Sequence, residues 1–238
     1  MKLDFRNAAA NWLSINRSTY AVALAMLATV SLAVVLGPWA HSTQNEARLV
    51  GMEAGKTPAG DEIATFSGGC FWAMQAMFSR LKGVDNVEAG YAGGHAPHPT
   101  YEEVCTETTG YAETVQIAFD PKVISYRDLV TIFFHVHNPT TPNQQGDDVG
   151  TSYRSIIFYH DAAQKATDDS VIAQVTKDRL WSDPIVTEVV PYASFYKAEQ
   201  YHQDYFAHNP DTGYCRFVVA PKVAKFREEY KDRLKPGG

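Results

Sequence analysis

A cysteine between two glycines and two large aromatic residues is the best candidate for chemistry in this sequence. The run Gly68-Gly69-Cys70-Phe71-Trp72 follows a short stretch at 62–67 that is typical of a β-strand. Apolar residues then recur at helical spacing up to position 81. Glycines allow a sharp turn, and the positive end of a helix favours a thiolate over a thiol. The pattern predicts a turn that presents Cys70 as a nucleophile, and a buried structural cysteine is the alternative.

Glu113 is the second candidate, because of the strand face on which it lies. The stretch 111–119 alternates, so Glu113 shares one face with Val115, Ile117 and Phe119. A carboxylate on this apolar face should be desolvated, which raises its pKa and keeps it protonated near neutral pH. Such a group suits general acid catalysis. The alternative, which the alternation supports equally well, is a glutamate at a strand end whose side chain reaches solvent. The catalytic interpretation requires Cys70 to lie opposite Glu113.

Composition limits the classes of function. The chain has 238 residues with 45% hydrophobic content, enough for one sizeable core with extensions. A formal net charge of −6 argues against nucleic-acid binding. Three scattered cysteines form neither a disulfide framework nor a metal-ligand spacing. We therefore predict a monomer with no metal, no cofactor and no nucleic-acid partner.

The N-terminal residues differ in character from the rest of the chain. Lys2, Arg6 and Arg17 precede an uncharged, largely apolar run at 20–40. This order predicts a signal anchor or transmembrane helix over 1–40, which would make the membrane a partner, followed by a flexible linker over 41–60. The positive-inside rule then places the remaining residues outside the cytoplasm, which means the periplasm if the source is a Gram-negative bacterium. The alternative is a cleaved signal and a secreted protein, although Pro38 is unfavourable near a cleavage site.

Strand and helix patterns alternate through residues 61–238. Strands are expected at 62–67, 84–94, 111–119, 154–160 and 185–190, and helices at 70–81, 125–138, 161–180, 197–208 and 221–235. A short helix is expected from Pro99 with Thr100 as its cap, and Ser125 with Asp128 has the spacing of a capping box. The alternation predicts a two-layer α/β domain, and its order is as compatible with a ferredoxin-like plait as with a parallel sheet.

Five blocks of this region, with two further motifs near its end, resemble methionine sulfoxide reductase A. The resemblance runs from about Ile63 to Leu234. Three positions depart from the family pattern: Tyr111 replaces the usual histidine, Glu107 replaces a small residue, and Asp147 replaces a frequent asparagine. The motifs are Gly69-Cys70-Phe71-Trp72, Gly90-Tyr91-Ala92-Gly93-Gly94, Pro99-Thr100-Tyr101-Glu102-Glu103-Val104-Cys105, Thr109-Gly110-Tyr111-Ala112-Glu113, the run from Gln145 to Ser155, the run from Tyr201 to Phe206, and Gly213-Tyr214-Cys215.

The resemblance implies an oxidoreductase that repairs proteins after oxidative damage. Its substrate would be the S-epimer of methionine sulfoxide, free or in a polypeptide, which the enzyme returns to methionine. The Cys70 thiolate would attack the sulfoxide sulfur while Glu113 protonates the departing oxygen, leaving a sulfenic acid on Cys70. Catalysis would need no cofactor.

The resemblance also implies how the substrate is held. Tyr91 and Tyr153 would donate hydrogen bonds to the sulfoxide oxygen, and Asp148 would order the polar side of the pocket. Phe71 and Trp72 would enclose the S-methyl group, since an aromatic wall suits a methyl group better than an oxygen.

Two cysteines remain to resolve the sulfenic acid. Cys105 lies in a short helical segment, where a buried and inert thiol is expected. Cys215 follows the turn-forming run at 209–213, which predicts a mobile C-terminal segment. A mobile donor has the advantage because a disulfide needs Cα atoms within about 7 Å. The resemblance around Cys215 agrees, so we predict a Cys70–Cys215 disulfide that thioredoxin or a thioredoxin-like protein reduces.

We therefore predict that residues 61–238 form an α/β (α+β) catalytic domain. It would be a two-layer sandwich with a ferredoxin-like mixed sheet, preceded by the N-terminal hydrophobic helix and followed by the mobile C-terminal segment.

Two rival functions belong to other classes. A Cys–His hydrolase or acyltransferase would use Cys70 with His95, His98, His135 or His137 as its base. A membrane-tethered binding module would capture methionine-bearing segments, and its binding would survive Cys70→Ser.

Overall fold

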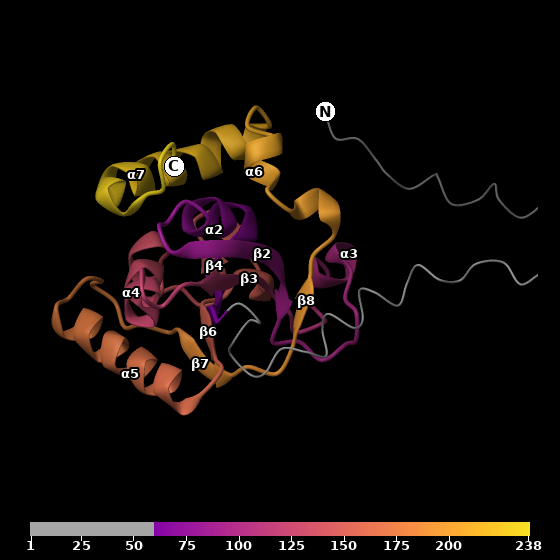
Figure 1. Cartoon of the computed structure of the whole chain (residues 1–238). Helices are drawn as coiled ribbons and strands as arrows, with labels where there is room; N and C mark the ends of the chain where they lie inside the picture. The colour runs from indigo at the N-terminus through magenta and orange to yellow at the C-terminus, as the bar shows by residue number, and fades with distance from the viewer. Residues whose placement is uncertain (1–59) are drawn as a thin grey trace, which may run out of the picture. The chain divides into compact units, whose positions relative to one another are not determined.

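The computed structural model describes residues 60–238 (Figure 1). The predicted N-terminal helix over 1–40, and the linker up to residue 59, lie outside the described residues. Within 60–238, every helix is too short or too polar to cross a membrane.

The sheet is a ferredoxin-like plait with one extra strand at each edge. In chain order the plait consists of β1 (Glu62–Ser67), α2 (Phe71–Phe78), β2 (Val84–Ala92), β3 (Ala112–Phe119), α4 (Tyr126–Val136) and β6 (Ile156–Tyr159). These strands stand in the order β6-β1-β3-β2, and all three neighbouring pairs are antiparallel. The prediction of a ferredoxin-like mixed sheet is thus confirmed, and the parallel-sheet alternative is wrong.

The two edge strands make the sheet mixed and six-stranded. β7 (Glu188–Pro191) pairs parallel with β6 after the long helix α5 (Ala162–Lys177), and β8 (Phe195–Lys197) pairs antiparallel with β2. The connections carry α3 (Tyr101–Val104), the small hairpin of β4 (Gln144–Gln145) and β5 (Asp148–Val149), and a 3₁₀ turn at Thr151–Tyr153. The predicted capping box at Ser125 is present on α4, and the predicted cap Thr100 of α3 also forms a capping box, with Glu103.

Phe66 of β1 shows how the two plait helices share one face of the sheet. Its ring lies 6.0 Å from that of Phe78 in α2 and 5.0 Å from that of Phe133 in α4, between ring centroids. Val115 and Ile117 of β3 belong to the same buried cluster. The helix-covered face of the sheet therefore holds the main core, and Glu113 lies on this face at the start of β3.

The region predicted as one helix over 197–208 is broken instead. It consists of the end of β8, a 3₁₀ turn at Gln200–His202 and the short helix α6 (Tyr205–His208). The buried Gln203 side chain bonds to the backbone N–H and C=O of Ala89 and to the C=O of Ala198. Asp204 has a φ of 52°, which a continuous α-helix does not allow. The side chain of Gln203 thus joins this segment to β2 and ends the helical pattern.

The C-terminal segment, which we expected to be mobile around Cys215, is helical there. A π-helical turn at Cys215–Val219 leads into α7 (Ala220–Glu229), and a 3₁₀ turn at Lys231–Arg233 follows. Cys215 and Val219 are fully buried, and Val223 and Phe226 join the core. In Figure 1 the yellow helix α7 runs beside α2, which it contacts.

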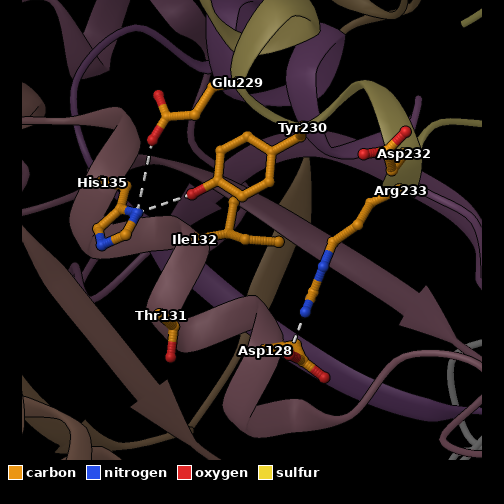
Figure 2. A pocket seen from close by; sticks show the side chains of 8 residues that line it. All are labelled: Asp128, Thr131, Ile132, His135, Glu229, Tyr230, Asp232 and Arg233. Atoms are coloured by element: carbon orange, nitrogen blue, oxygen red, sulfur yellow. Dashed lines mark hydrogen bonds and ion pairs between the residues drawn. The ribbon is translucent and has the colours of Figure 1, made fainter.

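Side chains at the end of α7 fasten the C-terminus to α4 (Figure 2). The His135 Nδ1 lies 2.8 Å from the Tyr230 hydroxyl and 3.7 Å from the Glu229 carboxylate. Arg233 donates a hydrogen bond of 2.8 Å to Asp128. Together these groups line a cavity of about 350 Å³ between the two elements.

Candidate active site

Cys70 lies immediately before α2, as its N-cap residue, and its side chain is 6% exposed. Gly69 makes the turn possible because its φ is +86°, and a Cβ at this position would meet the Gln145 side chain at 2.7 Å. The backbone N–H groups of Trp72 and Ala73 interact with the thiol. The predicted strand–glycine–cysteine–helix arrangement is present, with Cys70 at the helix start.

Glu113 lies next to Cys70 at the same helix end. Its Oε2 accepts a hydrogen bond of 2.9 Å from the backbone N–H of Phe71, and the residue is 4% exposed. Burial raises the pKa of Glu113 to about 8, helped by the negative charges of Asp148 and Glu107, while the Phe71 N–H opposes the rise. The carboxyl group is therefore mostly protonated at neutral pH, and it lies within the first turn of the helix that Cys70 begins.

The thiol of Cys70 differs from the expectation that the helix end would favour a thiolate. Burial raises its pKa, and so does the charge of Glu113. The Tyr214 hydroxyl and the N–H groups of the first helical turn lower the pKa, but burial outweighs them. The resting site thus holds two protons, one on sulfur and one on the carboxyl group.

The tyrosine hydroxyls near this pair are not all those expected. Burial and the charges of Glu113, Asp148 and Cys70 raise the pKa of Tyr153, which places its hydroxyl in their electrostatic field. Tyr91 is 1% exposed, and its hydroxyl donates to Glu199 at 2.9 Å. That hydroxyl is engaged with Glu199, and the role of Tyr91 in binding the sulfoxide oxygen stays a prediction.

Tyr101 is the tyrosine that sequence reasoning missed. It begins α3, its backbone N–H donates to Glu199 at 2.9 Å, and its ring lies 4.4 Å from that of His202. Burial and then the charge of Glu113 raise its pKa, and its hydroxyl interacts with the Cys105 thiol. The sequence feature that bears on Tyr101 is the helix cap at Thr100, because the residue after a cap is the first residue of its helix. Nothing in the sequence showed that this helix end faces Glu113.

Asp148 and Tyr214 meet on the polar side of Cys70. The Tyr214 hydroxyl donates to the Asp148 carboxylate at 2.7 Å and also interacts with the Cys70 thiol. Asp148 was expected in this place, but Tyr214 was singled out only as a neighbour of Cys215. The contact joins the C-terminal helical segment to the β4–β5 hairpin beside the thiol.

Aromatic rings surround the half-buried Trp72. Its ring stacks on Tyr205 at 3.8 Å and lies 6.3 Å from the ring of Phe71, between ring centroids. Its Nε1 donates to the Nδ1 of His202 at 3.1 Å, which fixes the indole orientation. The two residues predicted to enclose a methyl group therefore lie together, directly after Cys70.

Comparison with known proteins identifies the family of this arrangement. The sequence model described as "Peptide methionine sulfoxide reductase" matches residues 62–234. The MsrA enzyme of Thermus thermophilus is 52% identical over 176 residues, which cover 74% of this chain and 99% of that protein. The MsrA enzyme of Sulfolobus acidocaldarius is 52% identical over 72% of this chain and 97% of its own length. This chain belongs to the peptide methionine sulfoxide reductase family.

Solved structures of two reductases agree with the fold. Mxr1 of Saccharomyces cerevisiae in reduced form is 36% identical, with a TM-score of 0.61 over 67% of this chain and 92% of the yeast chain. Methionine sulfoxide reductase A of Corynebacterium diphtheriae is 32% identical, with a TM-score of 0.59 over 71% of this chain and 83% of that chain. The prediction of a methionine sulfoxide reductase is confirmed.

The same comparison corrects the predicted localisation. The match begins at residue 62 and covers nearly the whole length of both relatives, whose names describe the enzyme and mention no membrane. The membrane-anchored reductase with its catalytic domain outside the cytoplasm, and the membrane as its partner, are therefore wrong predictions. The apolar run was only near the minimum length of a membrane span, so its length was weak support for an anchor.

The burial of the two other cysteines of the reductase is the opposite of what the sequence predicted. Cys105, expected to be buried, is an exposed free thiol, whereas Cys215, expected on a mobile segment, is a buried free thiol. Cys105 ends the short helix α3, which is too small to cover its own last residue. Cys215 is covered because the segment after the turn-forming run packs against α2.

Two of the histidines proposed as bases for a hydrolase, His135 and His137, have hydrogen-bond partners other than Cys70. Both ring nitrogens of His137 are bonded, to the Phe133 carbonyl at 2.6 Å and to the Ser155 hydroxyl at 2.7 Å, and burial lowers its pKa to about 4. His135 belongs to the cavity at the C-terminus (Figure 2). None of the hydrogen bonds described within 60–238 joins Cys70 to a histidine.

The described part of the chain also offers no cluster of three or more histidine, cysteine or acidic residues that could hold a metal ion.

Proposed function

We propose that this reductase acts on the S-epimer of methionine sulfoxide, free or in oxidised proteins, with Cys70 as nucleophile and Glu113 as general acid. The observation that carries the proposal is the pairing of a cysteine at a helix start with a protonated carboxyl group bonded to the next N–H of that helix. A sulfoxide needs a nucleophile at sulfur and a proton at oxygen, and this pair supplies both.

The first step transfers one oxygen atom. Cys70 attacks the sulfoxide sulfur as its own proton leaves, and Glu113 protonates the sulfoxide oxygen, which weakens the S–O bond. The attack forms an S–S bond, and the hydroxyl then moves from the substrate sulfur to the Cys70 sulfur. The substrate S–O bond and the S–S bond break, methionine departs, and Cys70 is left as a sulfenic acid, while the proton that left its thiol returns to Glu113. Cys70 is oxidised by two electrons and the sulfoxide is reduced by two.

We assign oxygen binding to the hydroxyls of Tyr153 and Tyr101, with Asp148 ordering the polar side through Tyr214. Both tyrosines lie in the field of Glu113, and the hydroxyl of Tyr91 is engaged with Glu199. The burial of Tyr91 under Phe71, at 5.9 Å between ring centroids, suits a supporting role for the apolar wall.

The S-methyl group would enter the aromatic wall of Phe71 and Trp72. The stack of Trp72 on Tyr205 and its bond to His202 give this wall a fixed geometry. An apolar wall on one side and hydroxyl groups on the other favour one configuration at the sulfur atom, because exchanging methyl and oxygen would leave the oxygen without donors.

Cys215 is the proposed resolving residue. Its thiol would condense with the sulfenic acid, forming the Cys70–Cys215 disulfide and releasing one water molecule. Because Cys215 is buried within a π-helical turn, this step requires local opening of that turn, and π-helical turns are often found at functional sites. A dithiol reductant, thioredoxin or a thioredoxin-like protein, would then reduce the disulfide.

The decisive experiment is turnover with each epimer of a blocked methionine sulfoxide, using dithiothreitol as reductant. We expect reduction of the S-epimer alone, and loss of all reduction in Cys70→Ser with the fold retained. Turnover by Cys70→Ser would refute the assignment of the nucleophile. Binding of the sulfoxide without reduction by the wild-type protein would instead favour the binding module.

A further inference from the structure

Glu107 has a backbone conformation that is unusual for its residue type. It follows α3, and its φ of 61° lies in the left-handed region that few residues other than glycine adopt. Its backbone N–H donates to the Val104 carbonyl at 3.0 Å, so the residue completes the turn after the helix. A glutamate here is strained relative to glycine, which directs attention to what its side chain does.

The Glu107 carboxylate binds a turn far away in the sequence. Its Oε2 accepts hydrogen bonds from the Thr151 hydroxyl at 2.5 Å and from the Ser152 backbone N–H at 3.0 Å. Its Oε1 accepts from the Ser152 hydroxyl at 2.7 Å. Burial opposes ionisation of Glu107, but these hydrogen bonds outweigh it and lower its pKa, so the group is a carboxylate at neutral pH.

The bound turn is the one that carries Tyr153. The 3₁₀ turn spans Thr151–Tyr153, and a Cβ on the preceding Gly150 would collide with the Glu107 carboxylate. On its other side the turn is held by Arg154, which donates to the Gly110 carbonyl at 2.9 Å and to the Thr151 carbonyl at 2.8 Å. The segment 107–110 thus holds the turn by two groups, the Glu107 carboxylate and the Gly110 carbonyl that binds Arg154.

We propose that Glu107 is a positioning residue, which fixes the Thr151–Tyr153 turn and thereby holds the Tyr153 hydroxyl at the oxygen side of the Cys70 pocket. The inference rests on the proposed role of Tyr153 in binding the sulfoxide oxygen. A turn of three residues has little stability of its own, and three hydrogen bonds to one carboxylate restrict it strongly.

The same carboxylate has an electrostatic effect on the general acid. Its negative charge adds to that of Asp148 in raising the pKa of Glu113. The two effects of Glu107 are separable, because its hydrogen bonds act on Tyr153 whereas its charge acts on Glu113.

Two substitutions at this position separate the effects. Glu107→Gly relieves the backbone strain and removes the carboxylate, so any loss of activity cannot come from a worse backbone fit. Glu107→Gln keeps the size of the side chain and can bond to the same hydroxyls and N–H, because hydroxyl groups also accept from an amide. Glu102→Gln is the matched control, since it removes one exposed negative charge from α3 and none of the described hydrogen bonds joins Glu102 to the turn.

The test is a double-mutant cycle with Tyr153→Phe, measured as kcat/KM for methionine sulfoxide. In the wild-type background we expect Glu107→Gly to lose about tenfold to a hundredfold, the scale of a misplaced binding group. In the Tyr153→Phe background the same change should lose less than about threefold, because its effect acts through the missing hydroxyl. Equal losses in both backgrounds, or full activity of Glu107→Gly, would overturn the proposal.

A second variant covers the case in which Glu107→Gly does not fold, as judged by circular dichroism. Thr151→Val removes one donor to the carboxylate from the other side with little change of shape, and it should show the same dependence on the Tyr153 background. Glu107→Gln should keep most of the activity but move the alkaline limb of the rate profile to lower pH, and Glu102→Gln should change neither. If the wild-type protein fails to reduce the sulfoxide, the proposed function fails; if it succeeds and the cycle is additive, only this inference fails.

Discussion

The raised pKa of Glu113 makes protein stability itself a test of the candidate site. The group is nearly fully buried, and burial raises its pKa from the ordinary value of 4.5 to about 8. Between these two pH values the native protein binds the proton that the unfolded chain has lost. The free energy of unfolding must therefore fall as pH rises through this window.

The size of the effect follows from the shift. The stabilisation from the proton on Glu113 is fully present below pH 4.5 and is lost progressively up to pH 8. The loss is about 1.4 kcal/mol for each pH unit, or about 3 kcal/mol between pH 4.5 and pH 7. Glu113→Gln has no such proton, and its amide oxygen can still accept from the Phe71 N–H.

The measurement is urea unfolding of the wild-type protein and Glu113→Gln at pH 5, 6, 7 and 8. We expect the free energy of unfolding of Glu113→Gln, relative to that of the wild type, to increase with rising pH. The difference between the two proteins should grow by several kcal/mol over this range. Subtracting the two curves removes every other titrating group. A difference that is constant over this range, or that grows in the opposite direction, would show that Glu113 is ionised in the native protein, and the proposed general acid would then be untenable.

The same variant tests catalysis. Glu113→Gln should lose on the order of a hundredfold or more in single-turnover oxidation of Cys70, the scale of a positioned general acid. The wild-type rate should decline as pH rises through 8, because ionised Glu113 has no proton to give. A variant rate equal to that of the wild type across pH 6 to 8 would make Glu113 structural.

The remaining predictions concern the cysteines, the tyrosines and the C-terminal attachment. Cys215→Ser should complete the first turnover but stop recycling by thioredoxin, whereas Cys105→Ser should recycle normally; peptide mapping that finds Cys70 joined to Cys105 would reverse the assignment. Tyr101→Phe should raise KM and lower kcat/KM about tenfold or more, and Tyr91→Phe should chiefly lower the melting temperature, which kinetics and calorimetry separate. His135→Gln should lower the melting temperature by no more than a few degrees without changing kcat, since the His135 bonds lie at the half-exposed end of α7.

The parts of the site that the sequence predicted well depend on local pattern. The turn at Cys70 required only glycines before a helical repeat, and the strand face of Glu113 required only a period of two. The helix cap at Thr100 and the capping box at Ser125 were equally local and are present as expected. In each case the residues that decide the structure lie within one short stretch of sequence.

The parts that the sequence could not predict depend on contacts between distant segments. Tyr91 and Tyr101 are ten positions apart, and only the packing of Glu199 shows that its carboxylate accepts from the hydroxyl of Tyr91 but from the backbone N–H of Tyr101. Cys215 was expected to be mobile from the turn formers before it, because the burial of its helix against α2 has no signature in its own sequence. Gln203 likewise ends a helical pattern through bonds to a strand more than one hundred residues away.

The two protons of the resting site give a reason for burying both the nucleophile and the acid. A thiol with a raised pKa is a poor nucleophile and a poor target for oxidants, because the thiolate is the reactive form. When a sulfoxide oxygen enters, it offers an acceptor for the proton of Glu113, and transfer of that proton leaves a positive charge developing on the substrate beside the thiol. The carboxylate that Glu113 has become can accept the thiol proton, and the positive charge on the substrate stabilises the thiolate that results, so substrate binding would activate the nucleophile that burial had kept protonated. The pKa of Cys70 should accordingly fall when a sulfoxide binds, and the fall should be lost in Glu113→Gln. The control is titration of the thiolate absorbance with and without a bound sulfone, which does not react. The sulfone should not lower the pKa of Cys70, because a sulfone oxygen is a far weaker base than a sulfoxide oxygen. If the sulfone lowered this pKa as much as the sulfoxide does, this mechanism of activation would be refuted.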